Sequence, residues 1–367
     1  MKKNLFWVLL AAPLISPAQT DADKQQARQL KKEAIQIMDN GDPDKAITLL
    51  ESAQKLDPDD HSYLYETGFA LYVKKDYSKA IEVFRKTTKY SDVTDQCYQM
   101  LGNAYDLNGQ RSKARDAYAE GLKKFPAAGR LYMESGLIDL IEKDYNKAVA
   151  SWEMGIKVQP DYSSNYYRLT KLYAQTTDRI WAIFYGELFM NIERNSERTE
   201  EISRLLFNLY KASITFPPDS GNKSGGINLD LANSTINVDP KKGFKIPFHI
   251  TFPMGFLIGL TPSVMDPKKE VTIAMLSHAR VTFVDWWFNQ KQENKDYPNV
   301  LLDFHRMLND KGMLEAYNYW LLMKGNEDEF AQWRENHREK FDAFAAWFND
   351  NPLQLDTSHF FVRTQYD

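Results

Sequence analysis

Alanine recurs every 34 residues along the first half of this sequence. This repeat constrains the fold more strongly than any other feature. The column consists of Ala46, Ala80, Ala114, Ala148 and Ala182. Glycine keeps the same interval at Gly68, Gly102 and Gly136. A period of about 20 to 50 residues is typical of an array in which each structural unit stacks on the next. A single unit of this size cannot bury its apolar face alone, so the units must pack against their neighbours.

Further columns in the same register indicate the kind of unit. They comprise bulky residues at Leu64, Tyr98, Tyr132 and Tyr166, and prolines that close three units at Pro58, Pro126 and Pro160. Together the columns resemble the tetratricopeptide repeat family. The resemblance implies two antiparallel helices in each unit, with the glycine column on the first helix and the alanine column on the second. Small side chains in both columns would let the two helix axes approach closely, while large residues fill the space around that contact.

We therefore predict a mostly α-helical fold that begins with a tetratricopeptide α-solenoid of five helical hairpins. The predicted units are 27–60, 61–94, 95–128, 129–162 and 163–196. One more helix is predicted over 196–212, because Asn195 or Ser196 can cap its start and apolar residues follow at helical spacing. This helix would cover the apolar face of the last hairpin, so the array with its capping helix spans 27–212.

The N-terminal segment 1–18 has the composition of a secretory signal peptide. Lys2 and Lys3 precede an apolar run from Leu5 to Ile15, and small residues at Ser16 and Ala18 favour cleavage before residue 19. Residues 19–26 would then be a linker, and the mature protein would be exported, to a periplasm or out of the cell. The apolar run is too short to span a bilayer permanently. An uncleaved N-terminal anchor is the alternative.

Residues 213–265 change character and predict a β-rich or irregular segment. Apolar and polar residues alternate over 227–231 and again over 244–252, as strands do. Turn-forming residues at 239–243 separate these runs, so we predict a small β-hairpin or meander. The apolar run Phe252 to Leu260 favours a buried loop or strand, and contact with a membrane surface is the alternative reading.

Helical patterns return over 266–350 and predict a helical bundle followed by a tail at 351–367. The expected helices cover about 267–292, 298–309, 311–324 and 327–349. Asp266 as a cap and Pro267 at the first helical position mark the start of the first one. With the β segment these helices would form a small α+β domain. We recognise no family in residues 213–367.

The sequence offers little that would support catalysis or a cofactor. The formal net charge is −4 and no basic stripe is present, which argues against nucleic acid as a partner. The six histidines and the single cysteine, Cys97, form no spacing typical of a metal site. We therefore predict no cofactor and no metal.

One constellation could still carry chemistry, and it consists of His278, Arg280, Asp285 and His305. His278 and Asp285 are seven residues apart and share a face of their predicted helix. A buried His–Asp pair could serve acid–base chemistry, or the two groups could simply satisfy each other inside a core. An enzyme or small-ligand binder around His278 and Asp285 is therefore the alternative function, and a non-enzymatic protein is the main prediction.

The resemblance also implies a binding surface, because in this family the first helix of each unit lines a concave groove. The predicted binding residues are Tyr65, Phe69, Tyr72, Asn103, Arg130, Met133, Leu137, Leu140, Tyr167 and Lys171. Only Asn103, Arg130 and Lys171 could clamp a terminal carboxylate, and they are scattered, so no clamp of that kind is expected.

The mixed apolar and aromatic character of this surface favours a protein or peptide segment as the partner. The chain's own β segment or C-terminal helices are the alternative occupant. We therefore predict an exported scaffold or adaptor for protein–protein interaction, with no transmembrane span once the signal peptide is removed.

Overall fold

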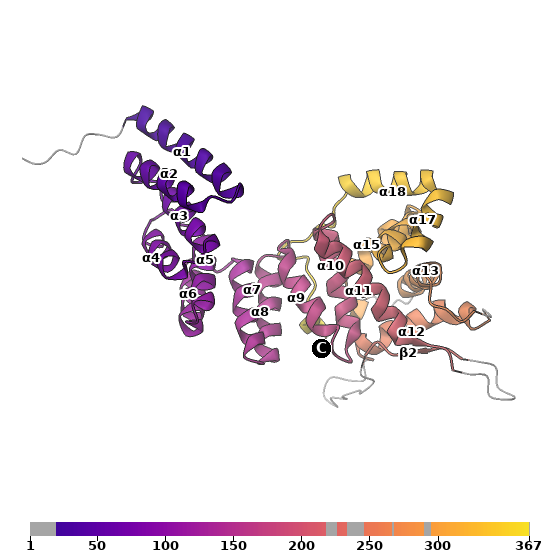
Figure 1. Ribbon diagram of the computed structural model, residues 1–367. Coiled ribbons are helices and arrows are strands. Elements are labelled where there is room, and N and C mark those ends of the chain that lie inside the picture. Colours follow the sequence, from indigo (N-terminus) through magenta and orange to yellow (C-terminus); the bar gives the residue numbers. More distant parts are fainter. Residues whose placement is uncertain (1–19, 218–225, 233–245, 266–267, 290–294, 367) are drawn as a thin grey trace, which may run out of the picture. The chain divides into compact units, whose positions relative to one another are not determined.

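The computed structural model describes residues 20–217, 226–232, 246–265, 268–289 and 295–366 (Figure 1). The signal peptide predicted over 1–18 and the turn predicted over 239–243 lie outside these ranges. The chain forms two compact units, divided between Glu120 and Gly121.

The first unit consists of helical hairpins in the predicted register. Its helices are α1 (Asp21–Asp39), α2 (Pro43–Leu56), α3 (Ser62–Val73), α4 (Tyr77–Thr87), α5 (Asp95–Leu107) and the start of α6 (Arg111–Lys124). Helix α1 begins inside the segment predicted to be a linker. It can start there because Thr20 caps it, with the hydroxyl accepting a hydrogen bond from the amide of Asp23 at 3.1 Å.

The turn inside each of four hairpins contains one residue with a left-handed backbone. These residues are Gly41, Lys75, Gly109 and Lys143, with φ of 88°, 66°, 75° and 64°. They follow one another at the same interval as the alanine column, so the turn geometry repeats with the sequence. A left-handed residue just after a helix lets the chain reverse and satisfies the last helical carbonyls. Lysine in that conformation costs about 1–2 kcal/mol relative to glycine.

The glycine column marks the closest approach of the two helices in a hairpin. A Cβ added at Gly102 would lie 2.0 Å from the ring of Tyr118, and one at Gly68 would lie 2.7 Å from the ring of Phe84. In the second unit, a Cβ at Gly136 would lie 2.4 Å from the indole of Trp152. The predicted role of the glycines is thus found at three repeats, because a large side chain from the second helix occupies the space that a Cβ would need.

The second unit begins with two more hairpins and their capping helix. These are α7 (Gly129–Ile141) with α8 (Tyr145–Val158), α9 (Ser163–Tyr173) with α10 (Arg179–Ile192), and then α11 (Glu197–Ser213). The capping helix starts as predicted, since the hydroxyl of Ser196 accepts a hydrogen bond from the amide of Thr199. With the hairpins of the first unit, these pairs confirm that residues 27–212 are mostly helical and consist of helical hairpins, as predicted.

The remaining elements of the second unit follow in chain order. They are β1 (Ile214–Thr215), β2 (Asn228–Leu229), α12 (Phe248–Leu260), η1 (Thr261–Met265), α13 (Ile273–Asn289), α15 (Val300–Asp310), α16 (Leu314–Leu322), α17 (Glu327–Asn336), α18 (Arg338–Asp350) and η2 (Arg363–Gln365). The two strands form one antiparallel ladder, in which Ile214 pairs with Leu229.

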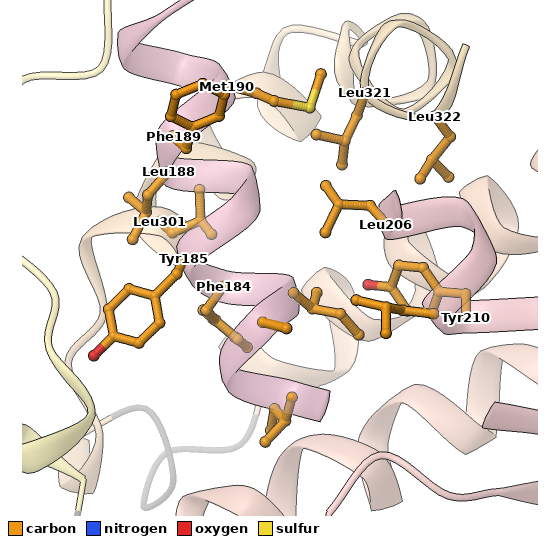
Figure 2. Packing of buried hydrophobic residues seen from close by; sticks show 14 of the residues in the cluster. Phe184, Tyr185, Leu188, Phe189, Met190, Leu206, Tyr210, Leu301, Leu321 and Leu322 are labelled. Carbon is orange, nitrogen blue, oxygen red and sulfur yellow. The ribbon is translucent and has the colours of Figure 1, made fainter. Parts of the chain in front are cut away.

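One hydrophobic core joins the hairpins of the second unit to everything that follows them. Helix α10 is its centre, because every residue from Ile180 to Asn191 is buried. Figure 2 shows side chains of α10 gathered with Leu206 and Tyr210 of α11, Leu301 of α15 and Leu321 of α16. The core extends from Met133 to Tyr366. The residues before and after position 213, where the β-rich segment was predicted to begin, therefore pack into the same core.

The strand predicted over 244–252 is wrong where the structure describes it. From Phe248 the chain is helical, and Phe248, Phe252 and Phe256 lie four residues apart on the buried side of α12. Alternation failed as a signal because Phe248 and Phe252 are four residues apart, a spacing that places both on one face in a strand and in a helix alike. The predicted β-hairpin or meander is reduced to the two-residue ladder of β1 and β2.

The apolar run Phe252 to Leu260 is half buried in this helix, and it is neither a loop nor a strand. Phe256 and Leu260 are fully buried, whereas Met254 and Ile258 are 55% and 47% exposed. Within the described ranges, the structure contains no helix with both the length and the apolarity needed to cross a membrane.

Two predicted helix boundaries near the C-terminus are also corrected. Helix α13 begins at Ile273 rather than at 267, because the carboxylate of Glu329 accepts hydrogen bonds from the amides of Ile273 and Ala274, both at 2.8 Å. The helix predicted over 327–349 is interrupted at His337, which separates α17 from α18. The last residues are part of the fold, since Phe361 and Tyr366 are buried.

Candidate functional site

Three of the predicted binding residues form an aromatic line in the first unit. Tyr65, Phe69 and Tyr72 are spaced by four and three residues on α3 and so share one face of it. All three are half-buried, and the rings of Tyr65 and Phe84 are 5.9 Å apart. The fourth residue, Asn103 on α5, accepts a hydrogen bond from the hydroxyl of Tyr118, so its amide helps to position the second helix of its own hairpin.

The same repeat positions on α7, in the second unit, are aliphatic. Met133, Leu137 and Leu140 lie on one face of α7, and Arg130 lies in its first turn. Met133 is buried, whereas Leu137 and Leu140 are partly buried and pack against the core. Helices α3 and α7 therefore present different chemistry at equivalent positions, with rings on α3 and flexible or branched aliphatic side chains on α7.

The capping helix already contacts the predicted binding residues of α9. The hydroxyl of Tyr167 donates a hydrogen bond to Glu201 of α11 at 2.7 Å, and Lys171 forms an ion pair with the same carboxylate. The ring of Tyr167 also lies 5.4 Å from that of Phe189. Here the chain fills its own array, because α11 takes the position that the first helix of a next repeat would occupy.

The predicted His278–Asp285 constellation separates into two parts in the structure. His278 and Asp285 are on the solvent-exposed side of α13, and Asp285 accepts a hydrogen bond from Asn309 at 2.7 Å. Arg280 and His305 point into the core instead and are each 4% exposed. The pair proposed for acid–base chemistry is thus on the surface, and the other two residues meet in the interior.

Arg280 and His305 meet at Glu187, which is not one of the residues predicted from the sequence. Its Oε1 lies 2.5 Å from Nε2 of His305 and accepts hydrogen bonds from the hydroxyl of Tyr317 at 2.8 Å and from the guanidinium of Arg280. Nε of Arg280 also donates to the side-chain oxygen of Asn318 at 2.6 Å. We call Glu187, Arg280, His305, Tyr317 and Asn318 the buried polar cluster.

The electrostatics of the buried polar cluster favour one arrangement of charge. Burial alone would raise the pKa of Glu187, but Arg280 and His305 lower it to about 2. Burial lowers the pKa of His305 below its usual value, despite the attraction of the carboxylate. At neutral pH the cluster therefore holds one ion pair and a neutral imidazole, whose Nε2–H donates to Glu187.

The buried polar cluster has no room for a substrate. The cavity beside it has a volume of about 10 Å³ and is lined by Glu187, Arg280, His305 and apolar side chains. That volume corresponds to roughly one water molecule. No group of three or more His, Cys, Asp or Glu side chains that could hold a metal ion occurs among the described residues. The cluster joins α10, α13, α15 and α16 through buried hydrogen bonds.

A signal for Glu187 was present in the sequence. It is the only charged residue between Arg179 and Glu193, in a helix that is otherwise apolar on all sides. A buried carboxylate requires partners, because an unpaired charge in a core is strongly destabilising. That reasoning would have selected Glu187, although its partners lie about a hundred residues further along the chain and could not be assigned by spacing.

Comparison with known proteins supports the repeat assignment. The sequence model of the tetratricopeptide repeat family matches residues 33–92. The predicted resemblance is therefore confirmed over residues 33–92.

Several solved structures are similar to this chain over about half of its length. MamA from Desulfovibrio magneticus is 20% identical, with 49% of this chain and 99% of that chain covered and a TM-score of 0.38. PilF of Pseudomonas aeruginosa is 15% identical, with 52% and 86% covered and a TM-score of 0.43. YrrB, described as a tetratricopeptide protein with an unusual peptide-binding site, is 17% identical, with 48% and 92% covered and a TM-score of 0.34. Likeness at this level does not extend to function.

Proposed function

We propose that this chain is an exported, non-enzymatic scaffold or adaptor that holds a segment of a partner protein against the first helices of its hairpins. The observation that carries this proposal is the half-exposed aromatic line Tyr65, Phe69 and Tyr72 on α3. Aromatic side chains combine a large contact area with few rotatable bonds, and they dominate the binding energy of many protein interfaces.

Aliphatic side chains at the ends of the same helices extend the apolar character of this face. Val73 ends α3 and is 48% exposed, while Leu107 ends α5 and is 52% exposed. These residues occupy the same position in successive repeats. Repetition of an exposed apolar side chain at one position of the unit supports a surface that is used for binding rather than for folding.

The export part of the proposal depends on the N-terminal segment 1–18. Its charged start, apolar run and small residues before residue 19 are the features that a signal peptidase recognises. Fractionation of the native host followed by N-terminal sequencing tests this point. A mature chain that begins at Gln19 in the extracytoplasmic fraction is expected. A full-length chain in the cytoplasm would contradict it.

The binding part is tested by charge substitution in the proposed groove. Tyr65→Lys with Phe69→Lys in the first unit, and separately Leu137→Lys in the second, should reduce crosslinked capture of partners in the native host about tenfold or more. The physical reason is that a charge must be desolvated when an apolar partner covers it. Glu82→Lys is the matched control, because it introduces the same side chain at an exposed position of α4.

Circular dichroism must show that the variants remain folded. Unchanged capture by both groove variants would remove the groove assignment. Loss of capture in the control variant as well would mean that charge, rather than the aromatic line, controls the interaction.

A further inference from the structure

A cavity of about 770 Å³ opens in the second unit. It lies where the start of α8 and the end of α9 meet the C-terminal residues of the chain. Its lining consists of Tyr145, Asn146, Val149, Ala150, Glu153, Leu172, Tyr173, Gln175, Thr176, Asp178, Arg363 and Thr364. The volume is within the range of about 300–1,000 Å³ that is typical of ligand sites. We call this space the edge cavity.

The C-terminal wall of the edge cavity is firmly held by the core. Phe361 is fully buried, with its ring stacked 5.2 Å from that of Phe184. The amide of Arg363 donates a hydrogen bond to the hydroxyl oxygen of Tyr185 at 2.8 Å. The hydroxyl of Tyr366 donates to the carbonyl of Pro298 at 2.9 Å. Residues on both sides of Arg363 are therefore fixed, and the cavity exists before any ligand arrives.

A buried carboxylate forms part of the lining. Glu153 on α8 is only 3% exposed, and its Oε1 accepts a hydrogen bond from the hydroxyl of Tyr185 at 2.7 Å. Nε of Arg363 lies 4.0 Å from the same oxygen. Within the part of the chain that the structure describes, no donor reaches Oε2 of Glu153. A carboxylate can accept about four hydrogen bonds, so this group has capacity for another donor.

The other walls suit a positively charged group. Among the described residues that line the cavity, the charged side chains are the carboxylates of Glu153 and Asp178 and the guanidinium of Arg363. Two tyrosine rings stand beside them, and Tyr145 is 52% exposed. Aromatic faces and carboxylates both attract ammonium and guanidinium groups, most strongly where water is partly excluded.

The geometry points to a ligand larger than a single amine, and we propose that the edge cavity binds a lysine or arginine side chain carried by an extended segment of a partner protein. The amides of Asn146 and Gln175 can pair with the peptide groups of such a segment. The aliphatic side chains of Val149 and Leu172 can contact the neighbouring residues of the segment. None of the ten predicted groove residues lines the edge cavity, so this site is additional to the proposed groove.

The test is a selection of randomised heptapeptides, displayed on phage, against the immobilised full chain. Wild-type protein should enrich peptides with lysine or arginine at one fixed position. Ala150→Trp should abolish the enrichment, because Ala150 is exposed and lines the cavity, so the indole fills it without disturbing the core. Met154→Trp is the matched control, since Met154 is exposed on the same helix and does not line the cavity.

Affinity measurements on the best peptide then isolate the carboxylate. Glu153→Gln keeps an oxygen for the hydroxyl of Tyr185 but removes the charge, and should weaken binding of the peptide at least tenfold by fluorescence polarisation. Replacement of the basic residue of the peptide by norleucine should weaken binding to the wild-type protein by a similar factor. The same replacement should change binding to the Glu153→Gln protein only slightly.

Three results would overturn the proposal: no enrichment of peptides, enrichment without a basic residue, or enrichment that Ala150→Trp leaves unchanged. Circular dichroism of each variant checks the fold, and Ala150→Trp carries the test if Glu153→Gln is unstable. Peptides that bind the groove instead would lose binding in the Tyr65→Lys, Phe69→Lys protein but not in Ala150→Trp. That outcome would contradict the edge cavity while supporting the groove.

Discussion

The two units of this protein differ in the sequence separation of the residues whose contacts stabilise them. In the first unit, the side-chain hydrogen bond from Tyr90 to the carbonyl of Pro58 joins residues that are 32 positions apart in the sequence, about one repeat. In the second unit, Glu187 bonds to Tyr317 across 130 positions, and Tyr185 accepts a bond from Arg363 across 178. Contacts between neighbouring repeats can form one at a time, whereas the second core needs distant segments to arrive together.

This difference teaches where each unit is vulnerable. The first unit depends on the same local contact made again in each hairpin, so damage should stay within the affected repeats. The second unit depends on one shared core with a charged centre. A single substitution at that centre should therefore destabilise all the helices that meet there, from α10 to α16.

The largest loss of stability is expected from Arg280→Ala, because Glu187 then stays buried without its ion-pair partner. Loss of one partner of a buried pair costs about 3–5 kcal/mol. Hydrogen exchange measured along a urea titration should show loss of protection in α10, α13 and α16, with α1 to α5 unchanged. A loss well below that range, or an equal loss in both units, would contradict the proposed distinction.

A double variant separates the role of the charges from the role of packing. Glu187→Leu combined with Arg280→Met replaces the ion pair by apolar side chains of similar size. Such replacements are often neutral or stabilising, because no charge remains to be desolvated. Most of the stability lost in Arg280→Ala should therefore return, measured in the same urea titration.

Acid should weaken the second unit more than the first. The pKa of Glu187 is lowered from 4.5 to about 2 in the folded state, so its contribution is complete above about pH 4.5 and is lost as the pH falls towards 2. A shift of that size corresponds to about 3 kcal/mol. The pKa of His305 is also lowered on folding, so stability should begin to fall below about pH 6.5.

Urea midpoints measured from pH 7 to pH 3 check this expectation. Glu187→Leu with Arg280→Met is the control, and it should show a shallower loss of stability in the second unit between pH 4.5 and 3. A parallel loss of stability in the wild type and the control would exclude the buried polar cluster as the source.

A smaller and more local effect is expected from Gly102→Val. A Cβ at this position would lie 2.0 Å from the ring of Tyr118, so the helices of that hairpin must separate. Overpacking of this kind costs about 1–3 kcal/mol. Gly109→Ala is the comparison in the same hairpin, where nothing lies within 4 Å and only the left-handed backbone opposes the change, at about 1 kcal/mol.

Hydrogen exchange should place the loss of protection from Gly102→Val in α5 and its neighbours, with the second unit unaffected. Loss of protection that spread to α10 and α13 would show that the repeats are coupled more strongly than their local contacts suggest.

The smallest loss of stability is expected from removing a helix cap, and it should be equal in the two units. Asp76 and Asp144 occupy equivalent repeat positions, and each side chain caps a second helix by accepting a hydrogen bond from the amide three residues later. Asp76→Ala and Asp144→Ala should each cost about 1 kcal/mol, read from the exchange protection of α4 and α8. A clearly larger cost for Asp144→Ala would mean that the shared core amplifies even local changes.

Local repetition explains how much of the fold could be predicted. The repeating columns led to five hairpins and a capping helix because the same short-range requirement, a glycine facing a large ring, recurs in successive units. The binding positions followed from the resemblance, and the structure places Tyr65, Phe69 and Tyr72 on one face of α3. It also places Tyr167 and Lys171 against Glu201, which the repeat pattern could not indicate because Glu201 lies beyond the last repeat.

Prediction was poorer after residue 213, for physical reasons that particular residues make clear. Phe248 and Phe252 are four residues apart and share a face in a strand as well as in a helix, and packing of their rings against α10 and α13 favours the helix. The start of α13 is fixed by Glu329, more than fifty residues away. Arg280 and His305 were selected as a possible site, but without Glu187 their role could not be inferred.

The sequence by itself therefore determined the repeat register, the hairpins and the character of the groove positions, since these depend on residues within one or two units of each other. The tertiary structure decided that α10 becomes the centre of a second core, that a carboxylate is buried there with its partners, and that the C-terminal residues close the edge cavity. Those features depend on contacts between segments up to 178 positions apart, and no local pattern in the chain specifies which of its distant segments will meet.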